Sequence, residues 1–193
     1  MIKTEIYKLS DEELITLVVK NHPHAMSCIV DRYKGMVFTL SFRILKNQLD
    51  AEEAAQDSFI KAFNSISSFR FDCKFSTWLY RICYNNAVSK SRGFKPIQID
   101  VDTKYDLQVD SANALDSLSA KDRAKFLNKA MESLESEESA LLTLYYVDGE
   151  SVSDISSITN LSESNVKVKL HRARKHLYSL LNVLLKEEVS MLL

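Results

Sequence analysis

The segment at residues 69–92 carries the side-chain types that can hold a single strand of nucleic acid. Five basic side chains, several aromatic rings and two amides share it with one acid, Asp72. Cations follow phosphates, rings stack on bases and amides hydrogen-bond to base edges. The alternative is the solvated basic face of an amphipathic helix, which composition alone favours because most charge runs are plain surface.

A helix from Phe75 is needed to position these groups. Its apolar residues recur at helical spacing and predict a buried stripe, with Trp78 as a core anchor rather than a stacking platform. The stripe consists of Phe75, Trp78, Leu79, Ile82 and Cys83. We expect the remaining face to be exposed; it carries Thr77, Tyr80, Arg81, Asn85, Asn86, Ser89, Lys90 and Arg92.

The composition predicts an all-helical protein. Among 193 residues there are 3 glycines and 2 prolines, too few for the turns of a strand-rich fold. There is no signal peptide and no apolar run long enough to span a membrane, so we expect a cytoplasmic protein without direct membrane insertion. The three cysteines lack CxxC spacing, which favours reduced thiols, and we expect no metal and no cofactor.

Acidic residues are concentrated early in a helix that we expect to begin at Asp50. Its inner face is predicted to comprise Ala54, Ala55, Phe59, Ile60 and Phe63. Acids stabilise a helix N-terminus by roughly 0.3–1 kcal/mol each, which explains the residues up to Glu53. It explains Gln56 and Asp57 less well, because they lie in the second turn.

Gly93 and Pro96 mark the end of the first domain. Residues 97–119 contain five aspartates against one lysine and have no helical period, so we predict a flexible acidic linker. A second helical domain follows. The fold class is therefore all-α, with two small helical domains joined by an acidic flexible linker.

The second domain contains a helix-turn-helix. Residues 151–154 form a capping box, residues 159–162 a tight turn, and a basic helix follows. Between residues 162 and 176, five cations oppose Glu163 alone, a net charge of +4. A basic second helix of this kind suits the major groove of DNA.

Three runs resemble bacterial RNA polymerase sigma factors, specifically the two-domain extracytoplasmic-function (ECF) group of the sigma-70 family. Residues 69–70 (FR) and 75–82 (FSTWLYRI), with Asn85, are similar to the promoter-melting segment. Residues 50–59 (DAEEAAQDSF) resemble the family's run that docks on the polymerase β′ coiled coil. Residues 161–174 (LSESNVKVKLHRAR) resemble the helix-turn-helix that reads the minus-thirty-five element.

The resemblance implies a role for each run, carried over by position. Binding of core polymerase is implied for Asp50, Glu52, Glu53, Gln56 and Asp57. Binding of minus-ten DNA, with a pocket for a flipped base, is implied for Phe69, Arg70, Phe71, Asp72, Lys74, Phe75, Arg81 and Asn85. Binding of minus-thirty-five DNA is implied for Ser164, Asn165, Lys167, Val168, Lys169, His171, Arg172 and Arg174.

These roles imply a domain division. Residues 1–95 form sigma domain 2, residues 96–120 the linker and residues 121–193 sigma domain 4. The implied partners are the β′ coiled coil and β flap of core polymerase, duplex promoter DNA and the melted non-template strand. The family's usual regulator is an anti-sigma factor, which can hold a sigma factor at the membrane.

Two other function classes compete with a promoter-directing initiation factor. An enzyme is disfavoured because no phosphate-binding glycine loop, metal-ligand cluster or Cys/His pair is present. A stand-alone helix-turn-helix regulator explains residues 151–176 but leaves the acidic helix and the aromatic basic segment without a role. We therefore expect a transcription initiation factor that performs no covalent chemistry.

Overall fold

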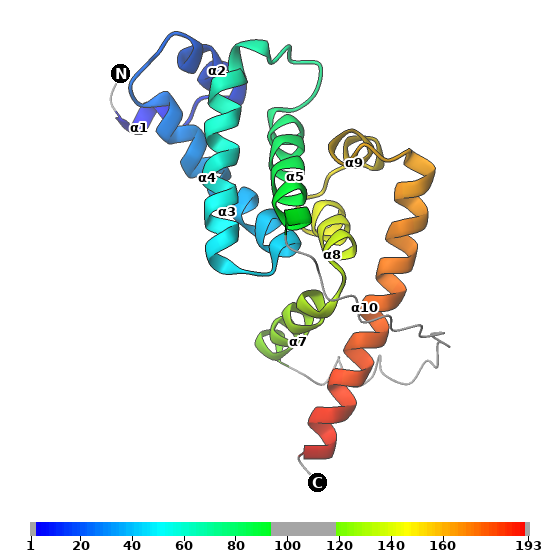
Figure 1. Ribbon diagram of the computed structural model, residues 1–193. Coiled ribbons are helices and arrows are strands. Elements are labelled where there is room, and N and C mark those ends of the chain that lie inside the picture. The colour runs from blue at the N-terminus through cyan, green and yellow to red at the C-terminus, as the bar shows by residue number, and fades with distance from the viewer. Residues whose placement is uncertain (1–2, 94–118, 192–193) are drawn as a thin grey trace.

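A computed structural model describes residues 3–93 and 119–191, and both described parts consist of helices and short connections (Figure 1). The predicted linker, residues 96–120, lies outside them except for its last two residues: Ser119 caps α7 and Ala120 begins it, so the linker prediction ran two residues too far. None of the described helices is long and apolar enough to cross a membrane. The helices are α1 (Lys3–Ile6), α2 (Asp11–Val19), α3 (Ala25–Leu45), α4 (Gln48–Ser65), η1 (Ile66–Ser68), α5 (Phe75–Gly93), α7 (Ala120–Ser133), α8 (Ser136–Leu142), η2 (Thr143–Val147), α9 (Val152–Thr159) and α10 (Glu163–Met191).

The first domain is built on α3, α4 and α5, each of which packs on the other two. Their inward faces bury Val37, Leu40, Phe59 and Leu79, as the helical spacing predicts. Residues 10–13 (SDEE) have the pattern of a capping box, and the structure contains it: the side chains and backbones of Ser10 and Glu13 exchange hydrogen bonds at the start of α2.

Two predictions for α4 were wrong. The helix begins at Gln48 instead of Asp50, because the Asn47 side chain caps it by accepting a hydrogen bond from the backbone N–H of Asp50 at 3.1 Å. Ile60, predicted to face inward, is 58% exposed. It lies four residues after the exposed Gln56 and therefore shares the outer face.

The second domain consists of α7 to α10, with α10 packed on α7, α8 and α9. The pair Asp148-Gly149 has the pattern of a helix stop, and the helical segment does end there: Gly149 has a φ of +70°, which glycine readily adopts. The capping box of Ser151 and Asp154 starts α9, as predicted. Asn160 ends α9 in the left-handed conformation, which makes the tight turn of the helix-turn-helix.

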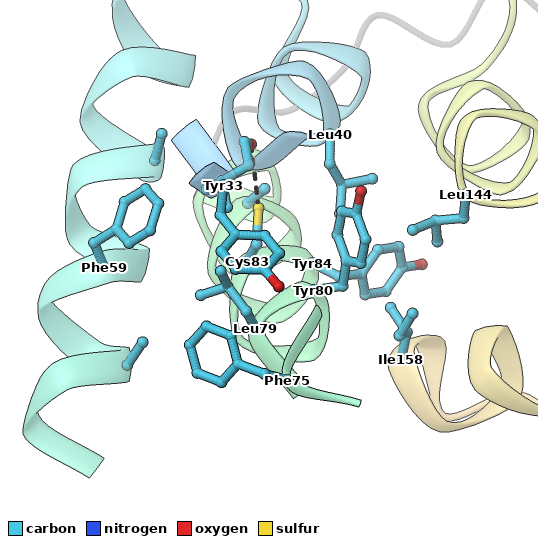
Figure 2. Close-up of a cluster of buried hydrophobic side chains, with 14 of the residues drawn as sticks. Tyr33, Leu40, Phe59, Phe75, Leu79, Tyr80, Cys83, Tyr84, Leu144 and Ile158 are labelled. Atoms are coloured by element: carbon cyan, nitrogen blue, oxygen red, sulfur yellow. Dashed lines mark hydrogen bonds between the residues drawn. The ribbon is translucent and has the colours of Figure 1, made fainter. Parts of the chain in front are cut away.

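The two domains share a continuous apolar core. Helix α9 packs on α5, and α8 packs on α3 (Figure 1). Figure 2 shows Tyr80 and Tyr84 of the first domain facing Leu144 and Ile158 of the second. The exposed fraction of Tyr80 is therefore only 2%.

Two of the three cysteines are core residues. Apolar residues recur at steps of three and four through residues 25–44, which predicts that Cys28 faces inward. Cys28 is buried, and so is Cys83. The Cys83 sulfur lies 3.3 Å from the Ser41 hydroxyl oxygen. Burial raises the pKa of Cys83 to about 11, so its thiol stays protonated and unreactive at neutral pH.

Leu79→Ala is expected to lower the free energy of unfolding by about 2–5 kcal/mol, because it leaves a cavity at a side chain that is 1% exposed. Ile60→Ala is the matched control on the outer face of α4 and should change stability by less than about 0.5 kcal/mol. Urea titration followed by circular dichroism measures both values. Equal effects of the two variants would contradict this description of the core.

Candidate functional site

The first candidate surface is the outer face of α4, which we call the acidic face. Glu52, Glu53 and Gln56 are exposed on it, while Asp50 and Asp57 are half-buried. Lys90 of α5 lies beside the acids, with its Nζ 2.7 Å from Glu53 and 3.7 Å from Asp50. The remaining carboxylates and the Gln56 amide are available to a basic partner.

Sequence reasoning missed two apolar members of the acidic face. Leu49 is 75% exposed and Ile60 is 58% exposed, one at each end of the row of polar residues. Leu49 lies four residues before Glu53, and Ile60 lies four residues after Gln56, so both share the face of these polar residues. A surface with apolar residues at its ends and polar residues at its centre can bury apolar area against a partner protein and can also attract basic groups of that partner.

The second candidate surface is the loop at residues 69–75, which we call the aromatic loop. Arg70, Asp72 and Lys74 are exposed in it. Phe71 is 48% exposed and has a φ of +61°, an uncommon conformation for a bulky side chain. Its ring contacts that of Phe69, with 4.8 Å between the centroids, and still remains half exposed, so it can stack on a base.

Phe69 and Phe75 support the aromatic loop from beneath. They are 9% and 4% exposed, and their ring centroids lie 5.7 Å apart. Both rings also contact Trp78, at 5.3 and 5.6 Å respectively, which agrees with its expected role as an anchor. These two phenylalanines can form the walls of a pocket, but in this arrangement they do not offer free faces for stacking.

A cavity lies on each side of the aromatic loop. One of about 230 Å³ is lined by Arg70, Asp72, Cys73, Trp78 and Arg81, among others. The other, of about 420 Å³, lies between the loop and the start of α2. The first combines a ring, two cations and an acceptor, which are the groups expected of a pocket for an extruded base.

The face of α5 is less exposed than its sequence suggested. Arg81 and Asn85 are exposed one turn apart, as predicted. Thr77 and Tyr80 were expected on the same exposed face, but each is only 2% exposed. The cause is the second domain, whose helix α9 packs on α5.

The third candidate surface is the exposed side of α10, which we call the recognition face. Val166, Leu170 and Ala173 are buried beneath it. All the predicted DNA-binding residues except Lys169 are exposed. Lys175 was counted among the five cations of this helix but not among the DNA-binding residues, although its place four residues after His171 is a signal that it shares the face. The row at helical spacing along the centre of the face comprises Ser164, Val168, His171 and Lys175.

Two cations of α10 already have partners within the second domain. Lys169 is half-buried and forms an ion pair of 2.5 Å with Glu137 of α8. Arg174 donates a hydrogen bond to the Tyr146 hydroxyl at 3.2 Å. Arg172 and Lys175 are exposed on the recognition face and therefore offer more accessible positive charges than Lys169 and Arg174.

Two segments of this chain match known protein families, one containing the acidic face and the aromatic loop and the other containing the helix-turn-helix. Residues 29–93 match the family described as Sigma-70 region 2, and residues 127–177 match Sigma-70, region 4. The ECF RNA polymerase sigma factor SigW of Bacillus subtilis is 32% identical over 172 residues, covering 84% of this chain and 92% of the relative. The chain belongs to the ECF group of the sigma-70 family.

Solved structures have the same fold as this sigma factor. CnrH, determined in complex with the cytosolic domain of CnrY, has a TM-score of 0.62 at 21% identity, covering 90% of this chain and 97% of CnrH. The sigma factor RpoE of Bartonella quintana, in complex with the anti-sigma factor NepR, has a TM-score of 0.61 at 21% identity, covering 83% and 98%.

Proposed function

We propose that this sigma factor binds core RNA polymerase and directs it to promoters by recognising minus-ten and minus-thirty-five elements and promoting strand opening. The observation that carries the proposal is the separation of charge on one chain. The acidic face of α4 lies apart from the aromatic loop and from the recognition face of α10. One surface suits a basic protein, and the other two suit DNA.

Each surface has a distinct task in this proposal. The acidic face, in domain 2 at residues 1–95, docks on the β′ coiled coil. The aromatic loop with Arg81 and Asn85 holds the melted non-template strand, with one base extruded into the pocket beside Trp78. The recognition face, in domain 4 at residues 121–193, lies in the major groove, where a good side-chain-to-base pair gives about 1–3 kcal/mol of discrimination.

An apolar groove of about 380 Å³ supplies a surface for the second polymerase contact, the β flap. Domain 4 contributes all of its lining residues except Arg43, which comes from α3. Its walls include Leu127, Met131, Tyr146, Val147 and Leu177. Leu127, Tyr146 and Val147 are 45%, 56% and 70% exposed, which makes this a conspicuous apolar patch. An apolar helix of the flap is a partner of suitable chemistry for the groove.

An anti-sigma factor is a further proposed partner. CnrH and the Bartonella RpoE are each named in complex with a second protein, an anti-sigma factor in the case of RpoE. A regulator that covered the acidic face or the apolar groove would prevent assembly with polymerase. Such a partner could also hold this sigma factor at the membrane.

Gel filtration with purified core polymerase tests the proposal against its main rival. We expect the sigma factor to co-elute with core and to bind free duplex DNA weakly. A stand-alone helix-turn-helix regulator would instead bind duplex DNA without polymerase, as a symmetric dimer. That second outcome, with no co-elution, would contradict the proposed function.

Phe71→Ala is expected to reduce promoter opening by about tenfold, because base stacking contributes about 1–3 kcal/mol per base. Chemical probing of unpaired thymines on a promoter with saturating holoenzyme measures the effect. Phe71→Tyr is the matched control, since it keeps the ring and should open DNA nearly as well as the unaltered protein. Normal opening by Phe71→Ala would exclude Phe71 from the stacking role.

A further inference from the structure

Arg174 connects two side chains that are 25 residues apart in the sequence. Its Nη1 donates a hydrogen bond to the Tyr146 hydroxyl at 3.2 Å, and its Nη2 lies 3.3 Å from Nδ1 of His171. His171 is three residues earlier in α10, on the same side of the helix. The guanidinium therefore bridges η2 and the recognition face, and we call these three residues the Tyr146–Arg174–His171 chain.

The direction of the contact between Arg174 and His171 follows from the chemistry of arginine. A guanidinium has donors only, so Nδ1 of His171 must accept this hydrogen bond. A ring nitrogen accepts only when it carries no proton, which leaves the single ring proton on Nε2. The chain thus selects one of the two neutral tautomers of His171 and restrains the orientation of its ring.

The other end of the chain is held by η2, which packs on α8 and α9. The Tyr146 ring meets the Tyr145 ring edge to face, with 4.9 Å between the centroids. Arg174 thus bonds to an acceptor that is itself positioned by its neighbours, and the planar guanidinium loses little further freedom when it bonds to His171. Each terminal nitrogen of Arg174 has a protein partner, although the resemblance implied that Arg174 binds DNA.

The free end of the His171 ring faces the recognition face. His171 is exposed and lies in the central row between Val168 and Lys175, and its Nε2 has no hydrogen-bond partner within residues 3–93 and 119–191. In the major groove guanine, adenine and thymine each present an acceptor, whereas cytosine presents only a donor. An Nε2–H opposite cytosine would set one donor against another and leave both without a partner.

We infer that Arg174 is a positioning residue that fixes His171 as a hydrogen-bond donor, so that His171 selects against cytosine at one position of the minus-thirty-five element. The inference rests on the proposed function, because it takes the recognition face to lie in the major groove. It assigns Arg174 to the support of a base-reading side chain instead of to a phosphate. A histidine can donate or accept, and here its protein neighbour decides which.

NMR of the free full-length protein tests the tautomer without DNA. Long-range correlations between ring protons and ring nitrogens, recorded at mildly alkaline pH where imidazoles are neutral, show which nitrogen carries the proton. His171→Gln identifies the signal. We expect the proton on Nε2 in the unaltered protein and a mixture of both tautomers in Arg174→Ala. A proton on Nδ1 in the unaltered protein, or an unchanged ring signal in Arg174→Ala, would overturn the inference.

Holoenzyme binding to promoters with each of the four bases at every minus-thirty-five position measures the selection. At one position the unaltered protein should bind cytosine at least about tenfold more weakly than the preferred base. Arg174→Ala should reduce this difference to about threefold or less and keep the selection at the other positions. Arg174→Lys keeps the charge and a donor and should retain most of the selection, whereas Tyr146→Phe should relax it in part.

Two further variants separate this role from a loss of charge or shape. Arg172→Ala removes a cation from the same face and should weaken every promoter in parallel. With His171→Lys, whose ammonium can only donate, cytosine should be rejected whether or not Arg174→Ala is added. A parallel loss at all positions for Arg174→Ala would overturn the inference and leave the proposed function intact. An unaltered holoenzyme without any promoter preference would contradict both.

Discussion

Replacing Gln56 and Asp57 together by lysine is expected to abolish binding to core polymerase while the helices stay folded. Gln56 is exposed and Asp57 is half-buried on the acidic face. Placing lysines against a basic partner weakens binding by several kcal/mol. We therefore expect the dissociation constant to rise at least about 100-fold, which corresponds to about 2.7 kcal/mol. Fluorescence anisotropy of the labelled sigma factor, titrated with core polymerase, measures this change.

The control for this double variant must change the net charge by the same amount at positions outside the acidic face. Glu5→Lys with Ser67→Lys does so at two exposed positions outside α4 and should bind core normally. Exposed substitutions usually alter stability by less than about 0.5 kcal/mol, so both proteins should unfold at similar temperatures. Normal transcription by the Gln56→Lys, Asp57→Lys protein would show that another surface docks on polymerase.

Lys167→Ala is expected to change which promoters respond, whereas Arg172→Ala should weaken all of them. Lys167 is proposed to face base edges, and loss of one good base contact costs about 1–3 kcal/mol at one position of the minus-thirty-five element. Arg172 is proposed to contact phosphate, so its loss should weaken binding to every promoter by a similar factor. It should also reduce the slope of log affinity against log salt concentration by about one. Arg172 is preferable to Arg174, because Arg174 also bonds to Tyr146.

Holoenzyme binding to a panel of promoters, each altered at one minus-thirty-five position, distinguishes the two effects. Lys167→Ala should lose discrimination at one position and keep it at the others. Arg172→Ala should lower affinity in parallel across the panel. A parallel loss for Lys167→Ala would assign that side chain to the DNA backbone instead of to a base.

Much of the fold could be predicted because its signals are local. The low glycine and proline content predicted helices, and the capping boxes at Ser10 and Ser151 marked where α2 and α9 begin. Apolar spacing identified the buried stripe of α3, including Cys28. Each of these depends on residues within one or two turns of each other, which is the range that sequence patterns report.

What the sequence did not predict depends on contacts between distant segments. Thr77 and Tyr80 have the polarity of surface residues, and only the packing of α9 on α5 buries them. Glu150 likewise has the charge of a surface residue, and it is buried in the fold because Ser76 and Thr77, from a distant segment, donate hydrogen bonds to it. Ile60 was misplaced because an apolar residue on a helix is usually buried, whereas a docking surface exposes some of them.

The exposure of the candidate DNA-binding residues could be predicted better than their contacts. Arg70, Asp72 and Lys74 in the aromatic loop and most residues of the recognition face are exposed, as their polarity suggests, while their binding of DNA stays a prediction. The sequence pattern could not indicate that Phe69 and Phe75 support the loop from inside, or that Lys169 pairs with Glu137. Those details follow from which side of each helix the neighbouring helices cover.

Run-off transcription with purified core polymerase on a library of random promoter sequences tests the central claim most directly. We predict transcripts that depend on the added sigma factor and come from templates sharing two short elements, one near minus ten and one near minus thirty-five. Transcripts should disappear with the Gln56→Lys, Asp57→Lys protein. The absence of any sigma-dependent transcript from every template, despite binding to core, would contradict the account.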